Sequence, residues 1–336
     1  MKIQLKVIAG VLLVAVLAAG IVLLPGYLQK EKPKESQEIK IKLAWLHQAQ
    51  FAGLYVAKEK GYYAKEGLDA TILPFSFEDP TIDAVAKGNA VFGIVGADEL
   101  VLARAKGLPI KAFAVIYKTN PVCAYSLKTS GITKPQDFIG KTVGLQRETN
   151  VEYLYYAMMA KLGINRSQIK EVTIGYDATE LLNGTTDVST GYIINEPHQA
   201  IEAGNEVNTI LMADYGVNMY ADVLFAREDM INDNPELVEK FLRATLKGWQ
   251  YAVEHENEAV DITLKYAPDG SKSHETYMLR NSIPLIHTGE RPIGWMEKAD
   301  WDQVQNILLE QKILNKSINI NEAYTMEFLE KIYGKQ

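Results

Sequence analysis

A short run of side chains that can stack and form hydrogen bonds lies near the start of the folded part of the chain. Residues 45–50 read Trp-Leu-His-Gln-Ala-Gln, so the run holds one indole, one imidazole and two carboxamides. An indole offers a flat face to a planar ring, and a carboxamide both donates and accepts hydrogen bonds. These residue types indicate binding of a planar solute.

The flanking segments place this run at the edge of a sheet. Apolar and lysine side chains alternate over 39–43, helical spacing follows over 51–58, and 68–73 again has the pattern of a strand. This order predicts one βαβ unit. Its first turn lies at the carboxyl end of the first strand, where open α/β sheets place their ligand crevice.

Composition limits the function classes. The chain has 336 residues, 47% of them hydrophobic and 23% charged, and a formal net charge of -7. Because its lysines and arginines are scattered in a net acidic chain, a nucleic-acid partner is not expected. Cys123 is the single cysteine, so neither a disulfide framework nor a cysteine metal site is expected. A chain of this length has room for two lobes with separate cores.

The amino terminus has the pattern of a membrane segment. Lys2 and Lys6 precede an uncharged run over 7–28, which is long enough to cross the hydrocarbon core of a bilayer as a helix. We expect an uncleaved anchor, with a cleaved export signal as the alternative. Residues 29–38 then form a polar tether. The folded part would face outside the cytoplasm, in the periplasm or at the cell surface.

Alternating strand and helix patterns continue through the chain. They restart near residue 143, and a long amphipathic helix is predicted over 235–254. Its apolar stripe includes Trp249, to which we assign a core position rather than a ligand role. The expected domains are a leader and tether at 1–38, a discontinuous first lobe at 39–125 and 223–336, and a second lobe at 126–222.

Several short motifs carry a resemblance to a known family. They are Gly-Asn-Ala-Val-Phe-Gly at 88–93, Gly-Lys-Thr-Val-Gly at 140–144 and Tyr-Ile-Ile-Asn-Glu-Pro at 192–197. Asp-Tyr-Gly at 214–216, Leu-Phe-Ala at 224–226 and Asn-Pro at 234–235 follow in order. Together with the opening stretch, they resemble the solute-binding proteins of ABC importers. The resemblance is to the branch whose relatives bind thiamine pyrimidine precursors, riboflavin, or sulfonates and nitrate.

The resemblance implies a fold and a function. The fold is α/β, a two-lobed type II periplasmic-binding-protein fold with hinge crossovers near 122–127 and 220–227, here preceded by the N-terminal hydrophobic helix. The implied function is capture of a planar heteroaromatic solute by closure of the lobes and delivery to an ABC permease. A thiamine pyrimidine precursor is favoured, with riboflavin next and then a sulfonate or nitrate. The protein is expected to be a monomer without a cofactor.

Enzymatic alternatives have little support in the residues. The same branch includes a fungal pyrimidine synthase that carries an iron-binding run of cysteines, and residues 214–224, where that run would fall, contain none. A hydrolase or lyase on the same two lobes is the other alternative. No phosphate loop or nucleophile elbow is present, and the five histidines are far apart in sequence, so no metal site is expected.

Twelve residues are candidates for ligand contact, and they follow predicted strands or begin predicted helices. Those expected in the first lobe are Trp45, Gln48, Phe51, Asp98 and Glu99; those in the second are Arg147, Glu148, Thr149, Tyr192, Asn195, Glu196 and Tyr215. His47 and Asn218 are weaker candidates.

Some of these candidates also have a purely structural explanation. Asp98 and Glu99 at a helix start are also explained by capping, as is Thr149, whereas the charge of Arg147 is more than a cap needs. Phe51 has the alternative of a core position. Glu196 is the sharpest expectation: at the end of a predicted strand and at least partly solvated, its carboxylate would accept hydrogen bonds from an aminopyrimidine.

Overall fold

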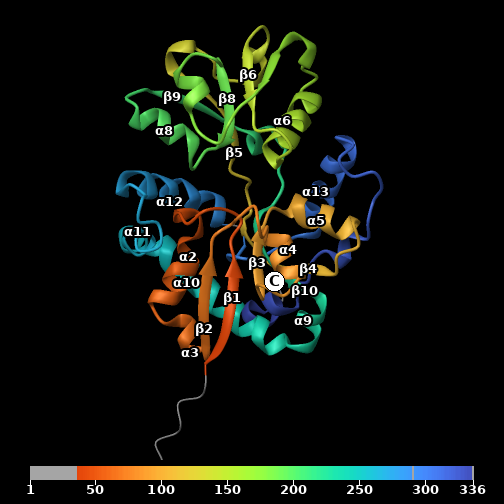
Figure 1. Cartoon of the computed structure of the whole chain (residues 1–336). Coiled ribbons are helices and arrows are strands. Elements are labelled where there is room, and N and C mark those ends of the chain that lie inside the picture. Colours follow the sequence, from red (N-terminus) through yellow and green to blue (C-terminus); the bar gives the residue numbers. More distant parts are fainter. Residues whose placement is uncertain (1–35, 290, 335–336) are drawn as a thin grey trace, which may run out of the picture. The chain divides into compact units, whose positions relative to one another are not determined.

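The computed structural model describes residues 36–289 and 291–334 (Figure 1). The hydrophobic helix expected over 7–28, and nearly all of the tether, lie outside these residues. Within them, none of the helices combines the length and the apolar character that a membrane crossing requires. Two five-stranded mixed sheets organise the described chain.

The first sheet has the strand order β2-β1-β3-β10-β4. Its strands are β1 (Gln37–Lys42), β2 (Leu68–Leu73), β3 (Phe92–Val95), β4 (Ile110–Tyr117) and β10 (Ala221–Arg227). Strands β1 and β3 are parallel, whereas β10 is antiparallel to both β3 and β4. The carboxyl ends of β1 and β3 therefore meet at one edge, beside the start of β10.

The second sheet has the order β7-β6-β8-β5-β9. Its strands are β5 (Val122–Leu127), β6 (Thr142–Leu145), β7 (Lys170–Thr173), β8 (Val188–Tyr192) and β9 (Val207–Leu211). Strand β6 is parallel to both β7 and β8, and β5 is antiparallel to β8 and β9. The ends of β6 and β8 thus form a second common edge.

Two short segments connect the sheets, one between β4 and β5 and one before β10. They are hydrogen-bonded to each other: the Asn120 backbone N–H donates to Asn218 Oδ1 at 2.8 Å, and Asn218 Nδ2 donates to the Lys118 carbonyl at 2.8 Å. The expected crossovers at 122–127 and 220–227 are largely strands inside the sheets. The connections precede them by a few residues, because the polar asparagines bond each other while the apolar residues after them pair within sheets.

Most helices belong with the first sheet. They are α2 (Ala52–Glu59), α3 (Tyr62–Lys65), α4 (Thr81–Ala86), α5 (Ala97–Ala105), α9 (Glu228–Asp233), α10 (Pro235–Glu254), α11 (Glu256–Thr263), α12 (Lys272–Ile286), α13 (Lys298–Glu310) and α14 (Glu327–Tyr333). Helix α10 has the bounds that its sequence predicts, with proline in its first turn. Its Phe241 ring stacks on Phe92 of β3 with 3.9 Å between centroids, so α10 packs on the sheet.

Helices α2 and α10 pack closely at two glycines. A Cβ on Gly248 would lie 2.1 Å from the Gly53 carbonyl oxygen, and one on Gly53 would lie 2.3 Å from the indole of Trp249. Trp249 is 1% exposed, as expected for a core residue. This contact fixes the helix that follows the 45–50 segment.

The second sheet carries α6 (Asn150–Lys161), α7 (Thr179–Leu182) and α8 (Glu196–Glu202). Short 3-10 turns complete the chain: η1 (Ala49–Phe51), η2 (Lys128–Ser130), η3 (Pro135–Phe138), η4 (Arg166–Gln168), η5 (Met212–Tyr215) and η6 (Ile320–Glu322). Strand β8 ends at Tyr192. Its next residues form a turn, because the Tyr192 backbone N–H donates to the Glu196 carboxylate at 2.8 Å.

Candidate functional site

Three carboxyl side chains gather at the edge where β3 ends and β10 begins. Asp98 and Glu99 are in the first turn of α5, and Asp222 is the second residue of β10. We call these three residues the carboxyl cluster. Asp98 is 3% exposed and Asp222 4% exposed. Within 36–289 and 291–334, none of the three forms an ion pair with a lysine, arginine or histidine.

Burial and mutual repulsion favour the protonated carboxyls. Burial raises the pKa of Asp222 to about 7, although the hydrogen bond from Gln50 opposes the shift. Burial also raises the pKa of Glu99, and the charges of Asp98 and Asp222 add to that rise. Burial raises the pKa of Asp98 as well. Near neutral pH, the cluster is therefore stabilised by a partner that donates hydrogen bonds or carries positive charge.

Glu99 is the exposed member of the carboxyl cluster, whereas Asp98 and Asp222 are almost fully enclosed. Protein around Glu99 still makes burial the main cause of its raised pKa. Solvent therefore reaches the cluster at Glu99.

The 45–50 segment contacts this cluster through its carboxamides. Gln50 Nε2 lies 3.0 Å from both carboxylate oxygens of Asp222, and Gln48 Nε2 donates to Gln50 Oε1 at 2.7 Å. Asp222 itself has φ of 51°, a left-handed conformation that is uncommon for residues other than glycine. Strained backbone of this kind often occurs at functional sites.

Tyrosines of the second sheet face the cluster. Burial raises the pKa of Tyr192, at the end of β8, and the negative charges of Asp222, Asp98 and Glu99 contribute to that rise. Tyr192 OH also accepts a hydrogen bond of 2.8 Å from Asn150 Nδ2 at the start of α6.

Tyr153 of α6 responds to the same charges. Its pKa is raised to about 12, first by burial and then by Asp98 and other acids that include Glu99. The charges of the carboxyl cluster thus act on Tyr192 and Tyr153 of the second lobe, and we call the region between the two sheet edges the crevice.

Aromatic rings gather just after the carboxyl ends of β1, β2 and β7. Trp45 stacks on Phe75 with 6.0 Å between centroids, and its ring lies 5.4 Å from that of Tyr176, which comes from the second-sheet side. Phe77 meets Phe75 edge-on at 5.1 Å. We call these four residues the aromatic cluster. Phe77 is 80% exposed and Tyr176 50% exposed, so the cluster presents uncovered ring surface.

Two candidates of the first lobe have other roles in the structure. Phe51 is 1% exposed and belongs to the hydrophobic core, so the structure supports the core alternative. His47 Nδ1 lies 3.0 Å from Tyr55 OH, and its ring contacts Tyr266, which places it against α2 and away from the cluster. Asp98 and Glu99 are members of the carboxyl cluster and Gln48 reaches it through Gln50, whereas Trp45 belongs to the aromatic cluster.

Glu196 differs most from its expectation. It is 4% exposed, not partly solvated. Its Oε1 accepts a hydrogen bond from Gln146 Nε2 and its Oε2 accepts one from the Tyr192 backbone N–H, both at 2.8 Å. Since both oxygens are bonded inside the second lobe, Glu196 holds the turn after β8 and orients Tyr192. The neighbouring Asn195 instead contacts His274 of α12, with 3.0 Å between Oδ1 and Nε2.

The remaining second-lobe candidates are mostly engaged locally. Arg147 forms an ion pair of 2.6 Å with Glu152. The Glu148 backbone N–H donates to Glu152, and Thr149 caps α6 by accepting from the Val151 N–H. Tyr215 lies in η5, where burial, then Asp214 and Asp137, raise its pKa. In the described residues no contact joins Tyr215 to the carboxyl cluster.

Sequence reasoning missed several residues of the crevice: Gln50, Asn150, Tyr153, Phe75, Tyr176 and Asp222. For Asp222 a signal was present, because an acid directly before the apolar run 223–226 is unusual for a strand buried in a sheet. For Phe75 and Tyr176 no local signal existed. They are about a hundred residues apart and meet only through Trp45.

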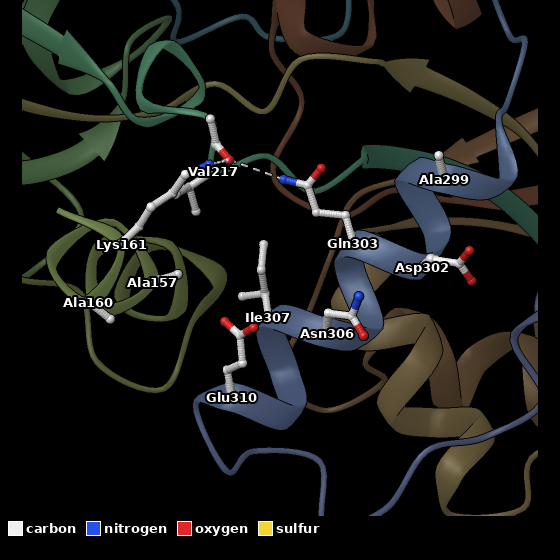
Figure 2. A pocket seen from close by; sticks show the side chains of 11 residues that line it. Ala157, Ala160, Lys161, Val217, Ala299, Asp302, Gln303, Asn306, Ile307 and Glu310 are labelled. Atoms are coloured by element: carbon white, nitrogen blue, oxygen red, sulfur yellow. Dashed lines mark hydrogen bonds between the residues drawn. The ribbon is translucent and has the colours of Figure 1, made fainter. Parts of the chain in front are cut away.

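A second concavity lies beside the connections between the sheets (Figure 2). It has a volume of about 620 Å³ and is lined by α6 and α13. Lys161 Nζ and Gln303 Nε2 both donate to the Gly216 carbonyl, at 2.7 and 3.4 Å. Asp302 is paired with Lys298 at 2.7 Å. Because its lining contains no aromatic ring and these polar groups are engaged, this recess suits a planar solute less well than the crevice.

The chain is similar to proteins of one known family. A family profile described as "NMT1/THI5 like" matches residues 48–259. The chain is 28% identical over 306 residues to the riboflavin-binding protein RibY of Chloroflexus aurantiacus, covering 87% of this chain and 86% of RibY. It is 26% identical to the formylaminopyrimidine-binding protein of Halalkalibacterium halodurans, covering 86% and 90% of the two chains.

Two further similarities bear on activity and fold. The chain is 25% identical to 4-amino-5-hydroxymethyl-2-methylpyrimidine phosphate synthase of Legionella pneumophila, covering 85% of this chain and 90% of that protein. The structure is similar to the periplasmic aliphatic sulphonate binding protein SsuA of Escherichia coli, with a TM-score of 0.70 at 14% identity, covering 85% and 91% of the chains. This likeness confirms the expected two-lobed α/β periplasmic-binding-protein fold.

Proposed function

Because this chain belongs to the NMT1/THI5-like family, we propose that it is the extracytoplasmic solute-binding component of an ABC importer. Its solute is a planar heteroaromatic molecule that donates hydrogen bonds, and a thiamine pyrimidine precursor is the class we favour. The two lobes close over this molecule, and the closed form is recognised by a permease. The expected N-terminal anchor would keep the protein at the outer side of the cell membrane.

The carboxyl cluster is the observation that carries this proposal. Three neighbouring carboxyls without a cation partner in the described ranges offer an anion no positive charge, and they favour an amino, hydroxyl or ring N–H donor. A bound sulfonate or nitrate would also favour the protonated carboxyls over the ionised ones, so its binding would weaken as the pH rises. We therefore place these anions last among the solutes.

An aminopyrimidine matches the cluster in a specific way. A carboxyl near its pKa can accept a hydrogen bond from the exocyclic amino group and donate one to the adjacent ring nitrogen. Asp222 has a pKa of about 7, so both of its protonation forms are accessible near neutral pH. The relative named for formylaminopyrimidine supports the same class.

Riboflavin is the second candidate, and the aromatic cluster favours it. Trp45, Phe75, Phe77 and Tyr176 offer more ring surface than a single pyrimidine covers. A three-ring flavin could stack there while its ribityl hydroxyls donate to the carboxyls. The relative named for riboflavin supports this alternative.

We also propose that the protein binds its solute without converting it. The relative from Legionella pneumophila carries a synthase name, so this point requires a direct measurement. Mass spectrometry of the solute recovered after incubation with the protein tests it: an unchanged mass supports binding alone, and a new product shows an enzyme.

Thermal melting against a panel of solutes tests the main proposal. The panel contains an aminopyrimidine, riboflavin, an alkylsulfonate and nitrate. A solute that binds the folded form at a hundred times its dissociation constant stabilises it by about 2.7 kcal/mol. We expect a rise in melting temperature with the aminopyrimidine or with riboflavin. A rise with the sulfonate or nitrate alone would overturn the heteroaromatic proposal.

One substitution connects the binding to the cluster. Glu99→Gln keeps the shape of an exposed side chain and removes a carboxyl whose pKa burial and the neighbouring acids raise, so the fold should be no less stable than in the unaltered protein. Losing a charge-assisted hydrogen bond of about 1.5–3 kcal/mol should lower the affinity by roughly ten- to more than a hundredfold. Glu254→Gln, at the exposed end of α10, is the matched control and should bind as the unaltered protein does.

A further inference from the structure

Two histidines from different lobes meet outside the solute crevice. His198 belongs to α8, which packs with the second sheet, and His274 lies in the first turns of α12, which packs with the first sheet. Their Nδ1 atoms are 3.0 Å apart. Glu202 lies one helical turn after His198 on the same face of α8, with its Oε1 3.8 Å from His198 Nδ1. The three ligand atoms lie within 4.8 Å of one another.

These distances are close to those of a transition-metal site. Zinc binds histidine nitrogen at about 2.0–2.1 Å in tetrahedral sites, so neighbouring ligand atoms lie about 3.3 Å apart. The two nitrogens would separate slightly, and the Glu202 carboxylate would move inward by rotation of its side chain. Glu202 is exposed, so it has room to rotate and leaves an entry path for an ion.

Neighbouring groups orient the ligand atoms. Asn195 Oδ1 lies 3.0 Å from His274 Nε2. Because a carboxamide oxygen accepts only, this contact places the proton of His274 on Nε2 and leaves the lone pair of Nδ1 directed at His198. His198 stacks on Tyr277 with 4.3 Å between centroids, and Glu202 Oε1 accepts from Ser271 Oγ at 3.1 Å.

The close approach of the two imidazole nitrogens suits a metal. Without an ion, one of the two Nδ1 atoms must carry a hydrogen and donate to the other. With an ion, both lone pairs point at it.

We propose that the closed arrangement of the lobes binds one divalent transition-metal ion, with zinc as the reference ion, through His198 Nδ1, His274 Nδ1 and the Glu202 carboxylate. Water completes the tetrahedron. Since two ligands come from one lobe and one from the other, the ion binds the closed form and not the open form. It therefore favours closure, and by linkage it strengthens solute binding. The site does not depend on which solute the crevice takes.

Titration of the full chain with zinc chloride, after removal of metals by a chelator, tests the site without any solute. Isothermal calorimetry should show one ion for each chain. His274→Gln and Glu202→Gln should each lower the affinity at least tenfold. His287→Gln, which changes an exposed histidine just after α12, is the matched control and should leave zinc binding unchanged.

The role of Asn195 in positioning His274 is tested separately. Asn195→Ala removes the acceptor that fixes the tautomer of His274, and loss of such an outer partner typically costs ten- to a hundredfold in metal affinity.

Small-angle scattering should show that zinc reduces the radius of gyration of the unaltered chain and not of Glu202→Gln. Glu202 is exposed, so its variant should fold normally, which melting curves without zinc would verify.

The proposal is wrong if the unaltered chain binds no zinc, or if zinc binding survives both His274→Gln and Glu202→Gln with unchanged affinity. Either result leaves the solute proposal intact, because no residue of the carboxyl cluster takes part. If no solute of the panel raises the melting temperature but zinc binds as expected, the solute proposal is wrong and the zinc proposal stands.

Discussion

Replacing Asp222 by asparagine should stabilise the folded protein, and increasingly so as the pH rises. Asp222 is 4% exposed and has a pKa of about 7, chiefly because burial penalises its charged form. In the unfolded chain an aspartate titrates near 3.9. Between these pH values the folded form binds more protons than the unfolded form, so the free energy of unfolding falls as the pH rises. Asparagine does not titrate and tolerates the left-handed backbone at this position.

The size of the effect follows from the two pKa values. Each tenfold change in a protonation equilibrium is worth about 1.36 kcal/mol, so the ionised Asp222 costs at most about 4 kcal/mol of stability above pH 7. The hydrogen bond from Gln50 to the carboxylate would persist to Oδ1 of the asparagine. The variant should equal the unaltered protein in stability near pH 4 and exceed it by a few kcal/mol at pH 8.

Denaturant unfolding at a series of pH values from 4.5 to 8 measures this difference. Asp69→Asn is the control, because Asp69 is an exposed residue of β2 and its replacement should leave the pH dependence unchanged. The reasoning is refuted if the stability difference between the Asp222→Asn variant and the unaltered protein stays constant across this range, or shrinks as the pH rises. Solute affinity should fall in the same variant, because the carboxyl of Asp222 is proposed to bind the solute.

Three further substitutions have clear expected outcomes. Gly248→Ala should lower the free energy of unfolding in denaturant by about 1–3 kcal/mol or more, because its Cβ would lie 2.1 Å from the Gly53 carbonyl oxygen. Gly175→Ala is the control and should leave the stability unchanged, because there is open space around this glycine. Glu196→Gln should cost about 1–3 kcal/mol of stability, since it exchanges one buried acceptor for a donor. An unchanged melting temperature would contradict the role of Glu196 in holding the turn after β8. Tyr176→Ser should weaken binding of a stacking solute in calorimetry while leaving the melting temperature of the free protein almost unchanged, because the ring is 50% exposed.

Local sequence patterns determined the regular elements. Helix α10 begins and ends as its proline and apolar stripe predict, and Trp249 is in the core as the stripe requires. Burial of a continuous apolar face is a property of neighbouring residues, so periodicity alone is sufficient to identify it. The placement of Trp45, Asp98 and Glu99 at strand ends follows from the same local logic.

Whether a polar side chain faces a ligand was decided by tertiary contacts. Glu196 has the strand-end position that predicts a ligand group, yet Gln146, fifty residues earlier in the chain, occupies one of its oxygens. Asp222 reaches the crevice because β10 returns to the first sheet, and its raised pKa comes from burial that no local pattern reveals. Exposure and hydrogen-bond partners depend on segments distant in sequence, which is why Phe51 is in the core and Glu99 is not.

The histidine pair illustrates the same division. The sequence shows that His198 and Glu202 are one helical turn apart, since that spacing is local. It does not show His274, which is 76 residues later and reaches His198 because α12 and α8 lie in contact. The sequence by itself determined the elements and one face of each. The tertiary structure decided which faces pack against each other, because the free energy of that packing depends on both lobes at once.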